Sequence, residues 1–277
     1  MEIRHLGTAA AERVPGLFCV CKICDNARKT GGKEIRTQSQ ALIDKTILID
    51  FPGDTYLHCL NYGLDLPTIE HLLITHWHSD HLYAEDLAYR MSGYANCLNN
   101  TLTVYGNDTT FQFYERAFFL EQRHDFDQIR FQLVRPGDTI DIDDRYRVWA
   151  YQATHGHQFG DAQFYAVSDH KRTLLYAHDT GVFLDEVWEQ MVSQKQRFDY
   201  VSLDCTEQTS QTKTVHMTFK ENVEIKERML DLNLAHANTV FVSNHFSHNG
   251  GETYESMTAL AKTEDFKVSY DNMVVNF

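Results

Sequence analysis

The chain has 277 residues, of which 43% are hydrophobic, and its formal net charge is −14 at pH 7. This composition supports a buried core and is unlike that of a disordered chain. The acidic balance argues against nucleic-acid partners, which require clustered lysine and arginine. No apolar stretch approaches the roughly 18 residues that span a membrane, and the first residues lack a signal-peptide pattern. We therefore expect a cytoplasmic protein with no membrane partner.

Only four prolines occur and no Ser/Gly-rich tract marks a linker, so we expect a single domain over residues 1–277. Short apolar runs predict five strands in the first half of the chain. These strands are Glu2–Leu6, Gln40–Ile43, Thr46–Ile49, His71–Thr75 and Thr101–Tyr105. A helix is expected after Asp80, with apolar side chains from Leu82 to Met91. The aromatic segment Thr109–Arg123 predicts another helix, either with a lid-like surface or in ordinary packing.

The second half continues the same alternation of strands and helices. The predicted strands are Ile129–Val134, Tyr146–Ala153, Gln163–Ser168, Thr173–Ala177, Tyr200–Leu203 and Thr239–Ser243. Helices are predicted at Leu184–Ser193, from the capping box at Thr218 to about His236, and near Tyr254–Lys262. Strands dominate both halves. We therefore predict an α/β protein, an αββα sandwich of two mixed β-sheets with helices on the outer faces.

The densest chemical signal follows the predicted strand His71–Thr75. Four potential metal ligands occur within six residues there: His76, His78, Asp80 and His81. Imidazole and carboxylate groups together suit zinc, manganese or iron. Four ligands in a tight loop cannot all reach one ion, so the loop favours two ions that share a bridging hydroxide. The alternative, a histidine-rich surface loop, does not explain the strict spacing.

Two ions need more ligands than this loop offers. Three residues that follow predicted strands can supply them: His155, Asp179 and His245. Any one of them would more often be an ordinary loop residue, but three in chain order favour metal binding. Neighbouring residues are alternatives for the same positions: His157, His178 and His248.

With these residues in place, the chain resembles the metallo-β-lactamase superfamily over nearly its whole length. The resemblance implies two ligand sets and a bridging aspartate: His76, His78 and His155 for one ion, Asp80, His81 and His245 for the other, and Asp179 for both. Asp50, at the end of its predicted strand, resembles the buried aspartate that supports the motif loop. A plain aspartate at a strand end is the alternative.

A cysteine cluster points to one branch of this superfamily. Three cysteines fall within six positions: Cys19, Cys21 and Cys24. In a reducing cytosol such a cluster is more often a metal site than a disulfide framework. Residues 7–10 and 14–15 precede it as in the PhnP-type phosphodiesterases, which hold a structural zinc with the cysteines and a C-terminal histidine. His248 matches that histidine, and a Cys₃His set is closed to substrate; a reduced, empty cluster is the alternative.

His216 is the remaining chemical candidate. It lies two residues before the predicted helix cap at Thr218 and matches the catalytic histidine of PhnP-like and tRNA-processing members. A helix N-terminus also favours anionic phosphate, so His216 could protonate a leaving alkoxide. An ordinary surface histidine is the alternative.

We therefore predict a PhnP-like, metal-dependent phosphodiesterase with His216 and Asp80 as its catalytic residues. Its substrate would be a small cyclic or diester phosphate, with phosphoribosyl 1,2-cyclic phosphate as the leading candidate. The expected cofactors are two divalent ions in the active site, zinc or manganese with iron as a further option, and one structural zinc. The resemblance also implies a homodimer.

Two other enzyme classes use similar metal ligands. A tRNA 3′-end endonuclease of the RNase Z type usually inserts a basic arm between the positions that match His155 and Asp179. Here only residues 156–178 separate them, which is 23 positions, and the net charge is negative. A lactonase or thioesterase shares the ligands but has no need of His216. A non-catalytic metal-binding protein is disfavoured by the full ligand set.

Overall fold

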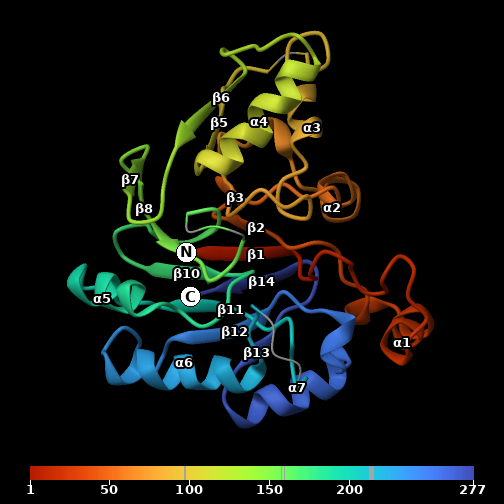
Figure 1. Ribbon diagram of the computed structural model, residues 1–277, viewed down its shortest axis with the longest axis vertical. Helices are drawn as coiled ribbons and strands as arrows, with labels where there is room; N and C mark the ends of the chain where they lie inside the picture. Colours follow the sequence, from red (N-terminus) through yellow and green to blue (C-terminus); the bar gives the residue numbers. More distant parts are fainter. Residues whose placement is uncertain (97, 157, 159, 212–214) are drawn as a thin grey trace.

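The structure is a computed structural model that describes residues 1–277 except 97, 157, 159 and 212–214. His157, the alternative to His155, lies outside the described residues. Within them, the strands form two seven-stranded sheets that pack face to face between two layers of helices (Figure 1). This is the αββα sandwich that the sequence predicts.

The first sheet is built mainly from the first half of the chain. Its strands, in spatial order, are β14 (Met273–Asn276), β1 (Glu2–Gly7), β2 (Gln40–Ile43), β3 (Ile47–Ile49), β4 (His71–Leu73), β5 (Leu102–Gly106) and β6 (Ile129–Leu133). Pairing is antiparallel from β14 to β3 and parallel from β3 to β6. The outer face is covered by α2 (Thr55–Tyr62), α3 (Ala84–Leu87) and α4 (Asp108–Leu120).

The second sheet also has seven strands with mixed pairing, and it is built from the second half of the chain. Their spatial order is β13 (Lys267–Val268), β12 (Val240–Asn244), β11 (Tyr200–Asp204), β10 (Thr173–Ala177), β9 (Gln163–Ser168), β8 (Tyr146–Gln152) and β7 (Thr139–Ile142). Pairing is parallel from β13 to β10 and antiparallel from β10 to β7. Its outer face is covered by α5 (Asp185–Ser193), α6 (Phe219–Asp231) and α7 (Tyr254–Thr263).

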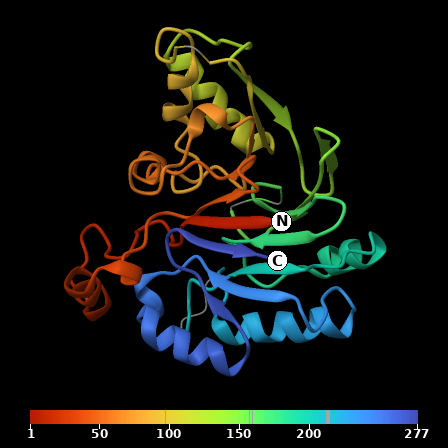
Figure 2. The same ribbon diagram turned by 180° about the vertical axis from the view of Figure 1, so that it is seen from behind.

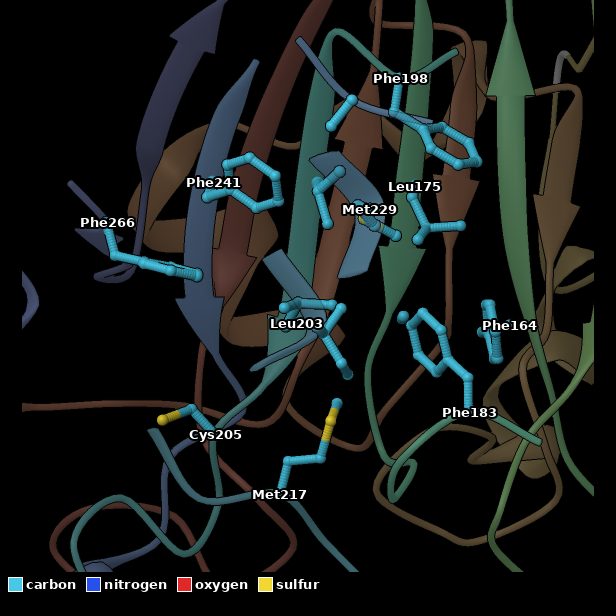
Figure 3. Packing of buried hydrophobic residues seen from close by; sticks show 14 of the residues in the cluster. Phe164, Leu175, Phe183, Phe198, Leu203, Cys205, Met217, Met229, Phe241 and Phe266 are labelled. Atoms are coloured by element: carbon cyan, nitrogen blue, oxygen red, sulfur yellow. The ribbon is translucent and has the colours of Figure 1, made fainter. Parts of the chain in front are cut away.

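Apolar side chains fill the space between the second sheet and its helices (Figure 3). Phe164 of β9 stacks on Phe183, which precedes α5, with ring centroids 4.9 Å apart. Met229 of α6 packs into the same cluster and is fully buried. Burial of such large side chains is the main stabilising contribution to the fold.

The two ends of the chain meet in the middle of the sandwich. The last strand, β14, leaves the second half and pairs with β1 at the edge of the first sheet, with Glu2 opposite Asn276. The termini therefore lie close together, as the view from behind shows (Figure 2). Helix α1 (Lys22–Thr30) stands apart from the layers and packs on a small cluster of its own with Val14.

The structure corrects several predicted boundaries. Helix α6 ends at Asp231 and not near His236, because Asn233 adopts a left-handed conformation with φ of 58° that a helix cannot continue. The helix after the histidine motif is reduced to α3 and a following 3₁₀ turn, Ala88–Arg90. Short elements such as α2 and β13 lacked a recognisable period and were not predicted. None of the described helices is long and apolar enough to cross a membrane.

Candidate metal-dependent active site

Polar residues gather where parallel strands of the two sheets end. Asp50 follows β3, Asp179 follows β10 by two residues and His245 follows β12 directly, while the loop that begins at His76 follows β4. The carboxyl ends of neighbouring parallel strands share one edge of a sheet, which is where α/β proteins place their sites. Asp50, Asp179 and His245 have φ values of 64°, 52° and 61°. Such conformations are costly for non-glycine residues and are typical of functional sites.

The first predicted ligand set converges on one point. The Nε2 atom of His76 lies 2.9 Å from Nδ1 of His78, which lies 3.1 Å from Nε2 of His155. The Oδ2 atom of Asp179 is 3.0 Å from Nε2 of His76. Tetrahedral nitrogen ligands at the usual metal–nitrogen bond length lie about 3.3 Å apart. The four side chains therefore fit a single metal ion.

The second predicted set adjoins the first through the same aspartate. The Nε2 atom of His81 lies 3.1 Å from Oδ2 of Asp179 and 3.3 Å from Oδ2 of Asp80. His245 completes the group, with its Nε2 atom 3.3 Å from that of His81. One donor atom from each of the four residues lies within 4.8 Å of the others. Asp179 belongs to both groups, which is the position that a bridging ligand requires.

The electrostatics of these side chains suit cations. Burial lowers the pKa of His76 to about 3 and that of His155 to about 4, so both rings are neutral at pH 7 and keep a lone pair for a metal. Burial alone would also lower the pKa of His81, but the charges of Asp80 and Asp50 raise it well above its ordinary value. A positive charge is therefore favoured beside the Nε2 atom of His81, whether it is a proton or a metal ion.

A network beneath the histidine loop fixes its shape. Asp50 is fully buried and accepts hydrogen bonds from the backbone and hydroxyl of Thr75, the backbone bond at 2.8 Å. Its other oxygen accepts from Nδ1 of His81 at 2.7 Å. This bond directs Nε2 of His81 toward Asp179, because the two ring nitrogens point in opposite directions. Asp50 thus has the contacts that its predicted supporting role requires.

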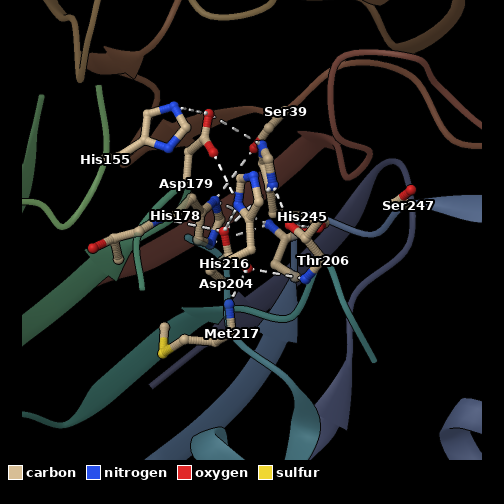
Figure 4. A network of polar contacts seen from close by, with 12 residues as sticks. Ser39, His155, His178, Asp179, Asp204, Thr206, His216, Met217, His245 and Ser247 are labelled. Atoms are coloured by element: carbon tan, nitrogen blue, oxygen red, sulfur yellow. Dashed lines mark hydrogen bonds and ion pairs between the residues drawn. The ribbon is translucent and has the colours of Figure 1, made fainter. Parts of the chain in front are cut away.

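His216, which lies between β11 of the second sheet and α6, is part of the same site (Figure 4). Its Nδ1 atom lies 3.1 Å from Oδ2 of Asp204 and 3.2 Å from Oδ1 of Asp179. Burial alone would lower the pKa of His216, but the negative charge of Asp204 raises it to about 9. The capping box predicted at Thr218, two residues after His216, is present, and α6 begins at the next residue, Phe219. The charge of Asp204 therefore favours a proton on His216, beside the candidate metal ligands.

Asp204 is a residue that the sequence analysis did not single out. It ends β11, is fully buried and accepts a hydrogen bond from the backbone of Thr206 at 2.9 Å. Aspartate at a strand end is the same signal that identified Asp50 and Asp179, so it could have been found. Its oxygens, with Asp179, His216 and His245, form a third overlapping group within 4.8 Å. His216 and Asp204 therefore have the geometry of either ligands or an acid and its support.

The direction in which each side chain points decides between His178 and the predicted metal ligands. The ring of His178 points between the sheets, where its Nε2 atom lies 2.7 Å from the hydroxyl of Ser202. His245 faces the candidate metal site, and Thr206 holds it there by donating to its carbonyl oxygen at 2.7 Å. His178 belongs to none of the candidate metal groups found among the described residues.

The cysteine cluster forms a separate site beside α1. The Sγ atoms of Cys19 and Cys21 lie 3.6 and 3.7 Å from Nδ1 of His248, and Cys24 completes the group. Tetrahedral sulfur and nitrogen ligands of zinc lie about 3.6 Å apart. Burial raises the pKa of the Cys21 thiol, but hydrogen bonds from Cys24 and Cys19 bring it to about 7. The donor set therefore fits a zinc ion.

A cavity of about 340 Å³ opens over the candidate ligands. Part of its lining is formed by His78, Asp80, His155, Asp179, His216 and His245. The remaining lining residues are Ala10, Ala11, Glu12, Thr206, Glu207, Ser247 and Asn249. The volume suits a small molecule and places both parts of the lining within reach of one ligand.

Comparison with known proteins agrees with this geometry. Residues 47–234 match a family described as the beta-lactamase superfamily domain. The chain belongs to the metallo-β-lactamase superfamily. Among curated proteins, none matches the sequence. The family assignment confirms the predicted resemblance and makes the chain a hydrolase of this fold whose His/Asp clusters can bind metal.

Solved structures of this superfamily share the fold over the full chain. A diphosphatase of the PhnP family has a TM-score of 0.77 and 18% identity, over 100% of this chain and 97% of that one. Human tRNase Z, short form, has a TM-score of 0.68 and 16% identity, over 100% of this chain and 99% of that one. Zinc-bound PqqB from Methylobacterium extorquens has a TM-score of 0.67 and 13% identity, over 100% of both chains. At these identities the likeness concerns the fold.

Proposed function

We propose that this chain is a metal-dependent phosphodiesterase that cleaves a small cyclic or diester phosphate. The observation that carries the proposal is the position of His216, a side chain 3.1 Å from Asp204 and 3.2 Å from Asp179 at the candidate metal site. A leaving alkoxide of a phosphodiester is a poor leaving group and needs a proton. His216 is placed to supply it.

Two divalent ions, zinc, manganese or iron, held by the two ligand groups would supply charge stabilisation for the phosphate and activation of water. Asp80 lies at the cavity surface, where its carboxylate can orient the attacking water. His216 lines the cavity and would donate its proton from Nε2, because Nδ1 lies 3.1 Å from Asp204. In this displacement the attacking water and the leaving oxygen must lie in line on opposite sides of the phosphorus atom.

The fold similarity to a diphosphatase of the PhnP family supports phosphoryl chemistry, and phosphoribosyl 1,2-cyclic phosphate is a natural first compound to assay. A tRNA 3′-end endonuclease is less favoured, since β9 and β10 occupy much of the segment from His155 to Asp179 and leave little length for an arm. A lactonase or thioesterase would leave His216 and Asp204 without a role. We also propose a third, structural zinc at the cysteine cluster, and a homodimer.

The first test is hydrolysis of bis(p-nitrophenyl) phosphate with added Mn²⁺ or Zn²⁺, compared with a lactone and a thioester. We expect turnover of the phosphodiester in at least one metal form. Turnover of only the lactone or thioester would contradict the proposal, as would no turnover at all.

The second test is His216→Ala, which should lower kcat for an alkyl phosphodiester by about 10²–10⁴-fold, because its alkoxide leaving group needs a proton, while the metal content stays unchanged. Elemental analysis is the control. Loss of metal in this variant would identify His216 as a ligand and not as the acid.

A further inference from the structure

The wall of the cavity that faces the candidate ligands has a chemistry of its own. It is formed by two segments that lie far apart in the sequence, residues 10–12 and the loop from Ser247 to Asn249. The backbone of Ala10 donates to the carbonyl oxygen of Phe246 at 3.0 Å, which joins the two segments. A substrate with its phosphate on the metal side would place its other end against this wall.

Glu12 is the charged residue of this wall, and its side chain is 34% exposed. Its Oε1 atom accepts hydrogen bonds from the hydroxyl of Ser247 and from the amide of Asn249, the latter at 3.5 Å. The same oxygen lies 3.9 Å from Nε2 of His248. These contacts fix one oxygen of the carboxylate, while the partial exposure leaves the group able to accept a hydrogen bond from a ligand in the cavity.

The cysteine cluster keeps this arrangement in place. Gly16 packs so closely on His248 that an added Cβ would lie 3.0 Å from its Nε2 atom. The other nitrogen of His248 faces Cys19 and Cys21. A metal-ligating histidine usually offers its second N–H to a carboxylate or carbonyl, and Glu12 is the carboxylate on that side. At 3.9 Å, Glu12 lies near this nitrogen but beyond hydrogen-bond distance, so His248 connects the cysteine cluster to the neighbourhood of Glu12.

The charge of Glu12 would act on the part of a substrate that reaches this wall. A phosphodiester has a single negative charge, which the metal side of the cavity can attract. A second anionic group on the substrate would lie near the carboxylate of Glu12, and Glu207 lines the same cavity. Like charges a few ångströms apart in a partly buried site repel strongly, whereas a hydroxyl or ammonium group can donate to the carboxylate.

We propose that Glu12 is the specificity-determining residue of this site and selects phosphodiesters whose non-reacting part carries a hydroxyl or ammonium donor. The inference rests on the proposed phosphodiesterase function and narrows it. Substrates that bear a second phosphate or a carboxylate on that side are disfavoured. Phosphoribosyl 1,2-cyclic phosphate carries a second phosphate, so we expect it to be a poorer substrate than an analogue that lacks this group.

The test uses three p-nitrophenyl phosphodiesters that differ only at the far carbon of the second alcohol. They are the 2-aminoethyl, 2-hydroxyethyl and 2-carboxyethyl esters. The metal-loaded full-length protein is compared with Glu12→Gln, which keeps an oxygen that can accept from Ser247 but loses the charge. Glu186→Gln on α5 is the control, since Glu186 is exposed and outside the cavity.

For the unmodified protein we expect kcat/KM for the aminoethyl ester to exceed that for the carboxyethyl ester by about tenfold or more. In Glu12→Gln this ratio should fall to about one to two, while metal content and the Glu186→Gln ratio stay unchanged. A ratio that is the same in Glu12→Gln overturns the assignment of Glu12 and leaves the phosphodiesterase function standing. No turnover of any ester by the unmodified protein overturns the function, and this inference with it.

Discussion

The contact between Asp204 and His216 makes the proposed acid testable without touching the acid itself. Asp204→Asn keeps the shape of the side chain and the oxygen that accepts from Thr206, but it removes the negative charge 3.1 Å from the His216 ring. A buried hydrogen bond between charged groups contributes about 1.5–3 kcal/mol. If that energy holds His216 in its protonated, oriented state, its loss lowers kcat by roughly 10–150-fold.

The assay is kcat for an alkyl phosphodiester, whose alkoxide leaving group needs a proton, in the single variants Asp204→Asn and His216→Ala and in the double variant. Because Asp204 acts through His216, the double variant should be no slower than His216→Ala by more than about twofold. Metal content must be measured in each, since Asp204 also lies 3.6 Å from Nδ1 of His245. Multiplicative losses in the double variant with full metal content would refute the reasoning.

Three further outcomes are expected. Elemental analysis should find close to three metal ions per chain, falling to about two in Cys21→Ser with the phosphodiesterase activity retained; an unchanged count would exclude metal at the cysteine cluster. Burial raises the pKa of Asp271 from 3.8 to about 6, so its stabilising neutral form is complete below about pH 4 and is lost as the pH rises through 6. Between pH 4 and pH 7, the change in the free energy of unfolding should therefore be less favourable by about 3 kcal/mol in the unmodified protein than in Asp271→Asn; equal changes in both proteins on urea unfolding would contradict this. Chelation of the metals should lower Tm by several degrees, because the carboxylates of Asp80 and Asp179 would stay buried without their cations; an unchanged Tm would argue that the site holds no metal.

The sequence by itself determined the elements whose signal is local. The histidine motif is contiguous, and its spacing indicated metal ligands before any fold was known. The capping box at Thr218 predicted the start of α6, and apolar runs predicted most central strands, because a buried strand must be apolar along its own length. These signals were also sufficient for the αββα architecture and the superfamily resemblance, which the structure and the family match confirm.

Other features depended on the tertiary structure because their residues meet only after the sheets have formed. The family resemblance assigned Asp179 and His245, but only the structure shows that His178 points away from the site, toward Ser202, because a sequence pattern does not carry the direction of a side chain. Asp204 carries the same strand-end signal in the sequence, but its contact with His216 became apparent only when β11 aligned beside β10 and β12. Glu12 reaches Ser247 across 235 positions of the chain, through the pairing of Ala10 with Phe246. Local spacing therefore identified the metal-binding chemistry, whereas strand order and register decided which residues surround the substrate.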